Sequence, residues 1–179
     1  LMKPNSVNGH VYLDQPTIPA RAFMNCDTLK AVTLGSKVVS IGNAAFYNCT
    51  NLHGVYNSTT TSSLRSIGRA AFAYSSNLLG VRSNFLQTVE IIGDYAFYEC
   101  TSLYSMVFEQ TSMLREIGNS AFQLCQSLEE IVLPQGVEII RNNTFAACYG
   151  MKRVVLPKSL TSIEDDSFYQ NVQLIQVIT

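Results

Sequence analysis

Cys49 lies in the stretch IGNAAFYNCTNL (residues 41–52) together with a glycine and an Ala-Phe pair, a combination that could belong to a reactive-cysteine site. A cysteine nucleophile occurs once and has a base beside it. Here all five cysteines stand three residues after a phenylalanine, as Cys26, Cys49, Cys100, Cys125 and Cys148. Ser75 and Asn171 occupy the same position in two further copies. A position that recurs and accepts other residues indicates packing, so we predict five reduced, mostly buried thiols.

The remaining polar residues offer no catalytic arrangement. His10 and His53 have no second histidine or acidic pair at ligand or triad spacing, and Asp165 and Asp166 are consecutive, so they would point in different directions. Five cysteines at this spacing match neither a disulfide framework nor a CxxC metal site. We therefore predict no catalytic, cofactor-binding or metal site, no cofactor, and a protein that is not an enzyme.

The cysteine position is one part of a repeat that runs along the chain. An isoleucine precedes each anchoring phenylalanine by five residues, and an apolar residue follows it by six and by nine. The anchors, separated by 23, 26, 25, 25, 23 and 23 residues, are Phe23, Phe46, Phe72, Phe97, Phe122, Phe145 and Phe168. A period of this length predicts a single solenoid domain over residues 1–179, in which residues 1–15 form a partial N-terminal coil.

Spacing within one repeat predicts two kinds of element. Five apolar positions fall at spacings typical of one face of a short helix, namely Ile117, Ala121, Phe122, Cys125 and Leu128. Ile131 and Leu133 then alternate with Val132, which predicts a short strand that ends at Pro134. The strand always begins at a fixed distance from the phenylalanine, so all variation in length lies after it, where we expect loops on a solvent-exposed edge.

Charge and hydropathy exclude two kinds of partner. The net charge is -1 without a basic cluster, so we expect no nucleic acid partner. No run approaches the roughly 18 to 20 apolar residues of a membrane span, so we expect no membrane insertion. The N-terminus lacks the apolar region of a signal peptide, but the chain begins and ends inside the repeat pattern, so we expect a mature or excised fragment.

Two units, LREIGNSAFQLCQSLEEIVLPQG and VEIIRNNTFAACYGMKRVVLPKS, resemble the BspA-type leucine-rich repeat, with the pattern LxxIxLPxxVxxIGxxAFxxCxx. The resemblance covers residues 16–179. It implies an α/β solenoid, a right-handed coil of about seven repeats of 23 to 26 residues, with a parallel β-sheet on the concave face and short helices on the convex face. Asn57 and Ser83 replace the leucine that completes the strand elsewhere, so coils two and three are expected to be looser there.

Strand alternation predicts which residues face outward. If Ile131 and Leu133 point into the core, Val132 and Glu130 must point out. The same register in every coil gives an outward row that begins at Thr33 and continues with Tyr56, Arg82, Val107, Val132, Val155 and Ile178. Four consecutive β-branched residues at a strand spacing of about 4.8 Å would form an apolar stripe about 14 Å long. Such a stripe reflects either strand propensity or an interface; we predict partner binding at these residues from Tyr56 to Ile178.

The family resemblance implies a cell-surface or secreted protein of the kind found in anaerobic microbes and parasitic protists. We therefore predict a non-catalytic recognition module for adhesion, which binds a protein or glycan on a host or neighbouring cell surface, with homo-association through the concave face as a further possibility. The alternative is a structural spacer or stalk whose binding function lies outside this fragment. Three glycosylation sequons begin at Asn48, Asn57 and Asn142, and Asn57, in the loop NSTTTSS, is expected to be the most accessible.

Overall fold

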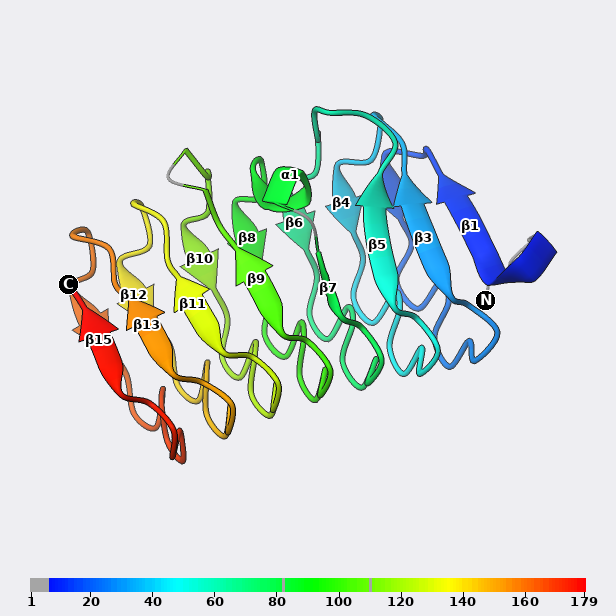
Figure 1. Cartoon of the computed structure of the whole chain (residues 1–179). Coiled ribbons are helices and arrows are strands. Elements are labelled where there is room, and N and C mark those ends of the chain that lie inside the picture. Colours follow the sequence, from blue (N-terminus) through cyan, green and yellow to red (C-terminus); the bar gives the residue numbers. More distant parts are fainter. Residues whose placement is uncertain (1–6, 82, 110) are drawn as a thin grey trace.

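The computed structural model describes residues 7–81, 83–109 and 111–179, without the side chains of Val7, Ser83, Asn84 and Val107. The chain forms a solenoid of about seven turns. Each turn contributes one strand to a first sheet, whose strands are three or four residues long except for the two-residue β7, and one two-residue strand to a second layer (Figure 1). A short 3-10 helix, η1 (Val7–Gly9), precedes the first strand. The parallel-stranded solenoid predicted from the repeat is therefore confirmed.

The longer strands form one eight-stranded parallel sheet, which we call the long-strand face. Each strand pairs with the equivalent strand of the next coil, so equivalent residues stand side by side across the sheet. The strands, in spatial order, are β1 (His10–Leu13), β3 (Ala31–Leu34), β5 (Gly54–Asn57), β7 (Gly80–Val81), β9 (Ser105–Val107), β11 (Glu130–Val132), β13 (Arg153–Val155) and β15 (Gln176–Ile178).

The two-residue strands form a second layer behind the first (Figure 1). Their pairing is also parallel, but it is divided into a five-stranded and a two-stranded sheet. The five are β2 (Thr17–Ile18), β4 (Ser40–Ile41), β6 (Ser66–Ile67), β8 (Ile91–Ile92) and β10 (Glu116–Ile117), and the two are β12 (Ile139–Ile140) and β14 (Ser162–Ile163).

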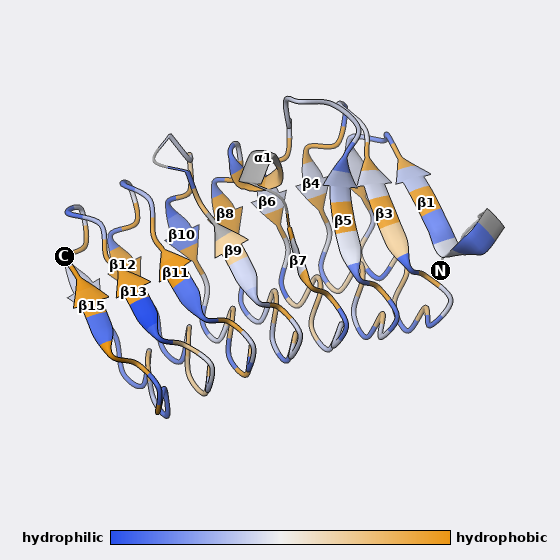
Figure 2. Ribbon diagram, in the orientation of Figure 1, coloured by the Kyte–Doolittle hydropathy of each residue, from blue (hydrophilic) through white to orange (hydrophobic). Residues whose placement is uncertain are grey.

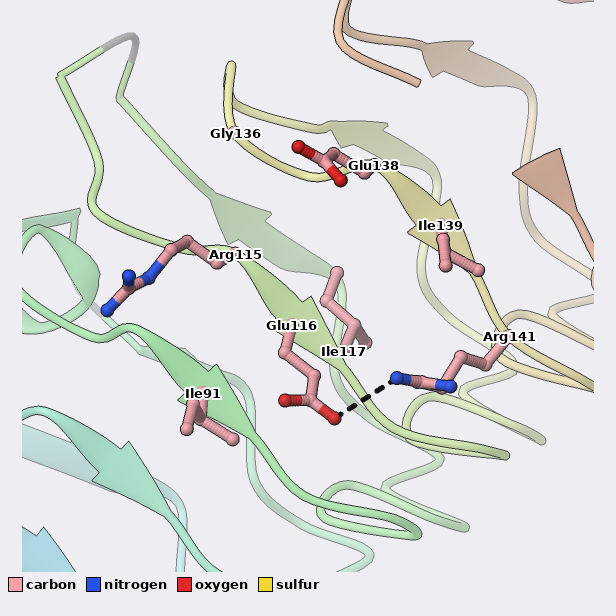
Figure 3. A pocket seen from close by; sticks show the side chains of 8 residues that line it. All are labelled: Ile91, Arg115, Glu116, Ile117, Gly136, Glu138, Ile139 and Arg141. Carbon is pink, nitrogen blue, oxygen red and sulfur yellow. Dashed lines mark hydrogen bonds and ion pairs between the residues drawn. The ribbon is translucent and has the colours of Figure 1, made fainter. Parts of the chain in front are cut away.

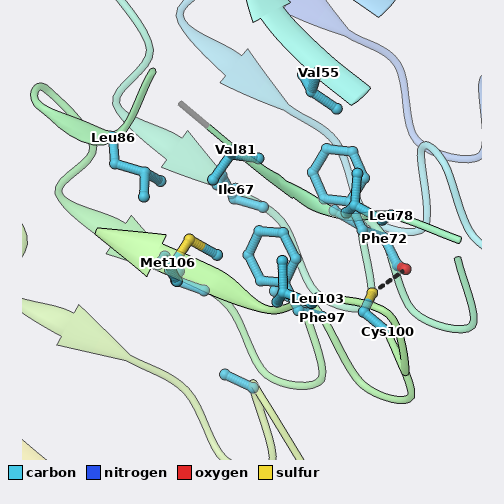
Figure 4. Close-up of a cluster of buried hydrophobic side chains, with 14 of the residues drawn as sticks. Val55, Ile67, Phe72, Leu78, Val81, Leu86, Phe97, Cys100, Leu103 and Met106 are labelled. Carbon is cyan, nitrogen blue, oxygen red and sulfur yellow. Dashed lines mark hydrogen bonds between the residues drawn. The ribbon is translucent and has the colours of Figure 1, made fainter. Parts of the chain in front are cut away.

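The core between the layers contains the seven anchoring phenylalanines in one column. Neighbouring rings stack with centroids 5.1 to 5.5 Å apart and planes within 2 to 15° of each other. Figure 4 shows Phe72 and Phe97 in this column, packed beside Leu78 and Leu103. Each fully buried ring stabilises the fold by about 2 kcal/mol, and no coil could bury its own ring alone. Phe168, in the last coil, is only half-buried.

The predicted short helices are wrong. In the coil around Phe122, the segment after β10 forms successive turns, with positive φ at Ser120 and Leu124. The equivalent pair of positions has positive φ in all seven coils. We call the surface formed by these turns the turn edge.

Hydrogen bonding explains why turns replace the helix. An α-helix satisfies its N–H groups internally, whereas here alternate N–H groups point to the next coil. The amides of Ser120, Phe122 and Leu124 donate to carbonyls of the following coil at 2.9 to 3.0 Å. Residues between them bond within their own turn, as Ala121 N does to Gly118 O at 3.3 Å. Helix-like spacing of apolar residues therefore arises from a different backbone geometry.

The edge loops after the long strands are only partly solvent-exposed. The loop after β7 forms helix α1 (Ser83–Leu86), in which Phe85 and Leu86 are buried in the core. Phe108, after β9, is also buried. Among the described residues, Val55 of β5 pairs with Val81 of β7, and both are buried. The looser packing expected at coils two and three stays a prediction.

Candidate interaction surface

The structure aligns the C-terminal part of the predicted outward row. Val132 lies between Val107 and Val155 in the register, and Val155 pairs with Ile178. The side chains of Val132, Val155 and Ile178 are half-buried, which leaves part of each accessible. Arg82 lies outside the described residues, and of Val107 only the backbone position is described. These four positions are therefore aligned across four adjacent strands.

Tyr56 occupies the N-terminal part of the same row, opposite Thr33. A Cβ built on Gly54 would collide with the phenol oxygen and ring of Tyr56, so the ring lies along its own strand, over Gly54. Tyr56 is half-buried in this position. The glycine two residues before it is what allows the aromatic side chain to lie flat on the sheet.

Sequence analysis missed one member of the row. β1 pairs with β3 so that Tyr12 stands opposite Thr33, and Tyr12 is 61% exposed. A hydrogen bond of 2.9 Å joins His10 Nε2 to the Thr33 hydroxyl on the same two strands. The alternation in HVYL was the available signal, because it matches the strands of later coils. The row therefore begins with an exposed tyrosine.

Charged residues flank the apolar part of the row. β11 and β13 begin with hydrophilic residues and end with hydrophobic ones (Figure 2). Glu130 and Arg153, opposite each other, form an ion pair, and Lys152 Nζ lies 2.9 Å from Glu129 Oε1. A cavity of about 430 Å³ between β9 and β11 is lined by Tyr104 and Val132, among others. An apolar centre with a charged rim is the usual anatomy of a protein interface.

A second cavity, of about 380 Å³, opens on the side of the short strands (Figure 3). In coils two to five a glycine follows the short strand, and a Cβ built on it would collide with the preceding coil, as at Gly118 with Asp94. The five-stranded sheet ends at β10, and in the next coil Arg141 replaces this glycine. Arg141 Nη2 lies 3.3 Å from Glu116 Oε1 across the gap. The lining contains two arginines and two glutamates, so its formal charges cancel.

The cysteine position has a role that the sequence did not reveal. The buried thiols donate to the phenylalanine carbonyl of the preceding coil, as Cys100 does to Phe72 O at 3.1 Å (Figure 4). The same bond forms from Cys49, Cys125 and Cys148 at 3.1 to 3.2 Å, from the Ser75 hydroxyl at 2.9 Å and from Asn171 Nδ2 at 3.0 Å. The same carbonyl also accepts a backbone N–H of its own coil, as Phe72 O does from Ser75 N at 3.0 Å, so the side chain supplies its second hydrogen bond. Cys, Ser and Asn all provide a small donor that can form this bond.

The four fully buried thiols are protonated in this environment. Burial raises the pKa of Cys49 and of Cys148 to about 12. Burial also raises the pKa of Cys100 and Cys125 above the usual thiol value. Cys26 is half-buried, and all five cysteines are free. Because the thiolate is the nucleophile, the four buried cysteines are not reactive groups at neutral pH.

Metal-binding and membrane-spanning elements are absent from the described part of the chain. Residues 7–81, 83–109 and 111–179 contain no group of three or more His, Cys, Asp and Glu side chains that could hold a metal ion. Within the same residues, no helix is both long enough and apolar enough to cross a membrane.

The sequons differ from the expected order of accessibility. Asn57 ends β5, and its amide nitrogen Nδ2 is buried without a hydrogen-bond partner, so the expectation that it is the most accessible is wrong. Asn48 Nδ2 donates to Asn25 Oδ1 at 2.9 Å. Asn142 is exposed. A sugar could be attached at Asn142 with the least disturbance.

One coil per repeat, a parallel sheet of short strands and a stacked apolar column define a solenoid of the leucine-rich-repeat class. The chain belongs to the BspA type leucine rich repeat region family, whose model matches residues 16–84 and 81–179 with six copies. The resemblance noted in the sequence is therefore confirmed.

Two solved structures share the fold. A leucine-rich repeat protein of T. pallidum is 28% identical, with a TM-score of 0.84 over 94% of this chain and 78% of that one. A leucine-rich repeat protein from Bacteroides ovatus is 26% identical, with a TM-score of 0.80; the match covers 94% of this chain but only 45% of that protein. No protein with a curated description matches the chain in sequence.

Proposed function

We propose that the chain is a non-catalytic recognition module that binds a protein or glycan on a host or neighbouring cell surface through its long-strand face. The observation that carries this proposal is the alignment of Val107, Val132, Val155 and Ile178 on four adjacent strands, beside an ion-paired rim. Aligned apolar residues of this kind are favoured at interfaces. Tyr56 and Arg82 have the residue types enriched at binding hot spots.

A role in adhesion and a cell-surface or secreted location complete the proposal, and both rest on the BspA-type family. The protonated, hydrogen-bonded cysteines support a binding role over a catalytic one. The same face can bind a second copy of the chain, since an apolar row of this length can pack against its own equivalent.

The proposal is tested by the double variant Val132→Thr/Val155→Thr. Threonine keeps the β-branched shape, so the strands should form as before. Each substitution replaces a methyl group that a partner could bury with a hydroxyl, which costs about 0.8 kcal/mol of binding free energy. The two substitutions together should therefore weaken association about 15-fold. Sedimentation velocity measures self-association, and surface plasmon resonance measures binding to purified extracellular-matrix proteins and immobilised glycans.

Val39→Thr/Val172→Thr is the matched control, because both valines are exposed, at 41% and 78%, and lie outside the row. This control should bind like the parent chain. If the row variant also self-associates and binds like the parent, the long-strand face is not the interface, and the spacer role takes its place.

A further inference from the structure

The turn edge of the first four coils carries two adjoining cavities that none of the features above uses. One, of about 570 Å³, is lined by Arg21 and Arg69 with Asn43 between them. The other, of about 320 Å³, is lined by four tyrosines. Arg69 and Ala70 line both cavities, so the two adjoin, and we call them together the turn-edge depression.

The two arginines are available to a ligand. Within the residues described, neither guanidinium forms an ion pair, although Arg65, Arg115, Arg141 and Arg153 all do. Asp94, which follows Arg69 by one coil in the same position, accepts hydrogen bonds from Asn119 N at 2.8 Å and Asn119 Nδ2 at 3.2 Å. Arg69 instead lies over the Tyr95 ring, 5.5 Å from its centroid. Two exposed cations in one cavity favour a ligand with negative charge.

The neighbouring cavity has aromatic walls and a floor of methyl groups. Tyr47, Ala73 and Tyr98 occupy the same position in three consecutive coils, so two rings flank an alanine. Tyr74 contacts both rings edge-on, with centroids 5.2 Å from Tyr47 and 5.4 Å from Tyr98. Tyr95 lies 5.7 Å from Tyr98. Tyr74 thus occupies the space between Tyr47 and Tyr98 above Ala73, and the four rings form one aromatic surface. Such a surface fits the apolar face of a ring-shaped group that lies against it.

Residue type at the turn positions sets these coils apart. Tyr74 and Tyr95 have φ of 63° and 56°, a region that favours glycine and asparagine over bulky residues. Asn25 and Asn48 occupy the position of Tyr74 in the first two coils. The chain thus places aromatic side chains where the backbone prefers asparagine, and does so beside the arginines.

We propose that this depression binds an acidic oligosaccharide, with a sugar ring against the tyrosines and its carboxylate or sulfate on Arg21 and Arg69. The positive charges of Arg21 and Arg69 attract the acidic group, and the tyrosine rings pack against the apolar face of the sugar. The phenol hydroxyls donate and accept hydrogen bonds, as sugar hydroxyls require. Among the described residues, no Leu, Ile, Val, Met or Phe lines either cavity, so this lining lacks the aliphatic pockets that hold peptide side chains.

The site lies on the turn edge, away from the long-strand face, so the proposal does not depend on the interface proposed for the long-strand face.

Isothermal titration of the full chain should show saturable, salt-sensitive binding of a heparin-derived hexasaccharide or of a sialylated oligosaccharide. The sialylated sugar carries carboxylate without sulfate, so its binding would show that carboxylate is sufficient. Heparin carries both groups, so binding of heparin alone would point to sulfate. The desialylated sugar and poly-glutamate serve as probes that lack, respectively, the charge and the ring.

Four substitutions test the residues. Arg21→Gln and Arg69→Gln should each weaken binding about tenfold, because each removes a charge-assisted hydrogen bond. Tyr74→Asn and Tyr98→Gln introduce residues that other coils carry at the same positions, Asn48 and Gln123, so they should fold while weakening the binding of the acidic sugars.

Arg115→Gln and Tyr169→Gln are the controls, since they remove an equal charge and an equivalent ring elsewhere, and they should leave binding unchanged. The proposal is overturned if neither acidic sugar binds saturably, if poly-glutamate binds as tightly as the sugars, or if Arg115→Gln weakens binding as much as Arg69→Gln. Val132→Thr/Val155→Thr should retain full sugar binding, which separates this test from that of the long-strand face.

Discussion

Replacing Phe122 with alanine should remove the centre of the phenylalanine column. The ring is fully buried and stacks on Phe97 at 5.2 Å and on Phe145 at 5.4 Å. Its neighbours are held by their own coils and cannot collapse into the space, so the free energy of unfolding should fall by about 3 to 5 kcal/mol. Phe168→Ala should cost about half as much, because that ring is half-buried and has one stacked neighbour, at 5.5 Å.

Urea denaturation followed by far-ultraviolet circular dichroism measures both losses. Tyr104→Ala, at a residue 59% exposed, is the control and should change the midpoint little. Equal losses for Phe122→Ala and Phe168→Ala would refute the reasoning, because a stacked one-dimensional core requires the central ring to contribute more.

The cysteine position supports three further predictions. Cys125→Ser should change stability by less than about 1 kcal/mol, whereas Cys125→Ala should cost about 1 to 2 kcal/mol, because it removes the buried sulfur and one of the two hydrogen bonds to Phe97 O, the other coming from Cys100 N; urea midpoints of the two variants test this. Thiol titration of the native chain should modify Cys26 first and the other four slowly, and rapid modification of two or more would contradict it. Cys49 and Cys148 have a pKa of about 12 when folded against 9.0 for an unperturbed thiol, so the free energy of unfolding should be constant below about pH 9 and fall above it, by about 1.4 kcal/mol per pH unit for each thiol. Cys49→Ser/Cys148→Ser should reduce that slope, and an unchanged slope would show that the folded thiols ionise normally.

Periodicity made the solenoid predictable, because a repeat aligned at four positions determines which residues stack from coil to coil. Strand alternation likewise placed Val132 and Val155 on one row, and the register bears this out. The turns could not be distinguished from helices, since Ile117 and Phe122 bury the same faces in either geometry. Only the inter-coil bonds from Phe122 N and its neighbours, together with positive φ at Ser120, decide between them.

Contacts between different coils set the limits of prediction for the sites. The hydrogen bond from Cys100 Sγ to Phe72 O joins residues that are 28 positions apart, and the local sequence around these two residues does not predict it. Arg21 and Arg69 are 48 positions apart and line one cavity only because their coils stack on either side of the coil that carries Asn43. Phe85 and Leu86 lie in an inserted loop that is expected to be solvent-exposed, yet they are buried because α1 turns back onto the core.

The most direct test of recognition through the long-strand face is to block that face with a bulky label. Because the four buried thiols are protonated, a new cysteine in a Cys26→Ser background can be labelled selectively with a maleimide-linked polymer. Gln176→Cys, on β15 beside Ile178, lies on the face, and Asn142→Cys is exposed at the turn edge of the sixth coil. Label at Gln176→Cys should abolish self-association and binding to matrix proteins, while label at Asn142→Cys should leave both intact; retention of both activities by the two labelled chains would contradict the account.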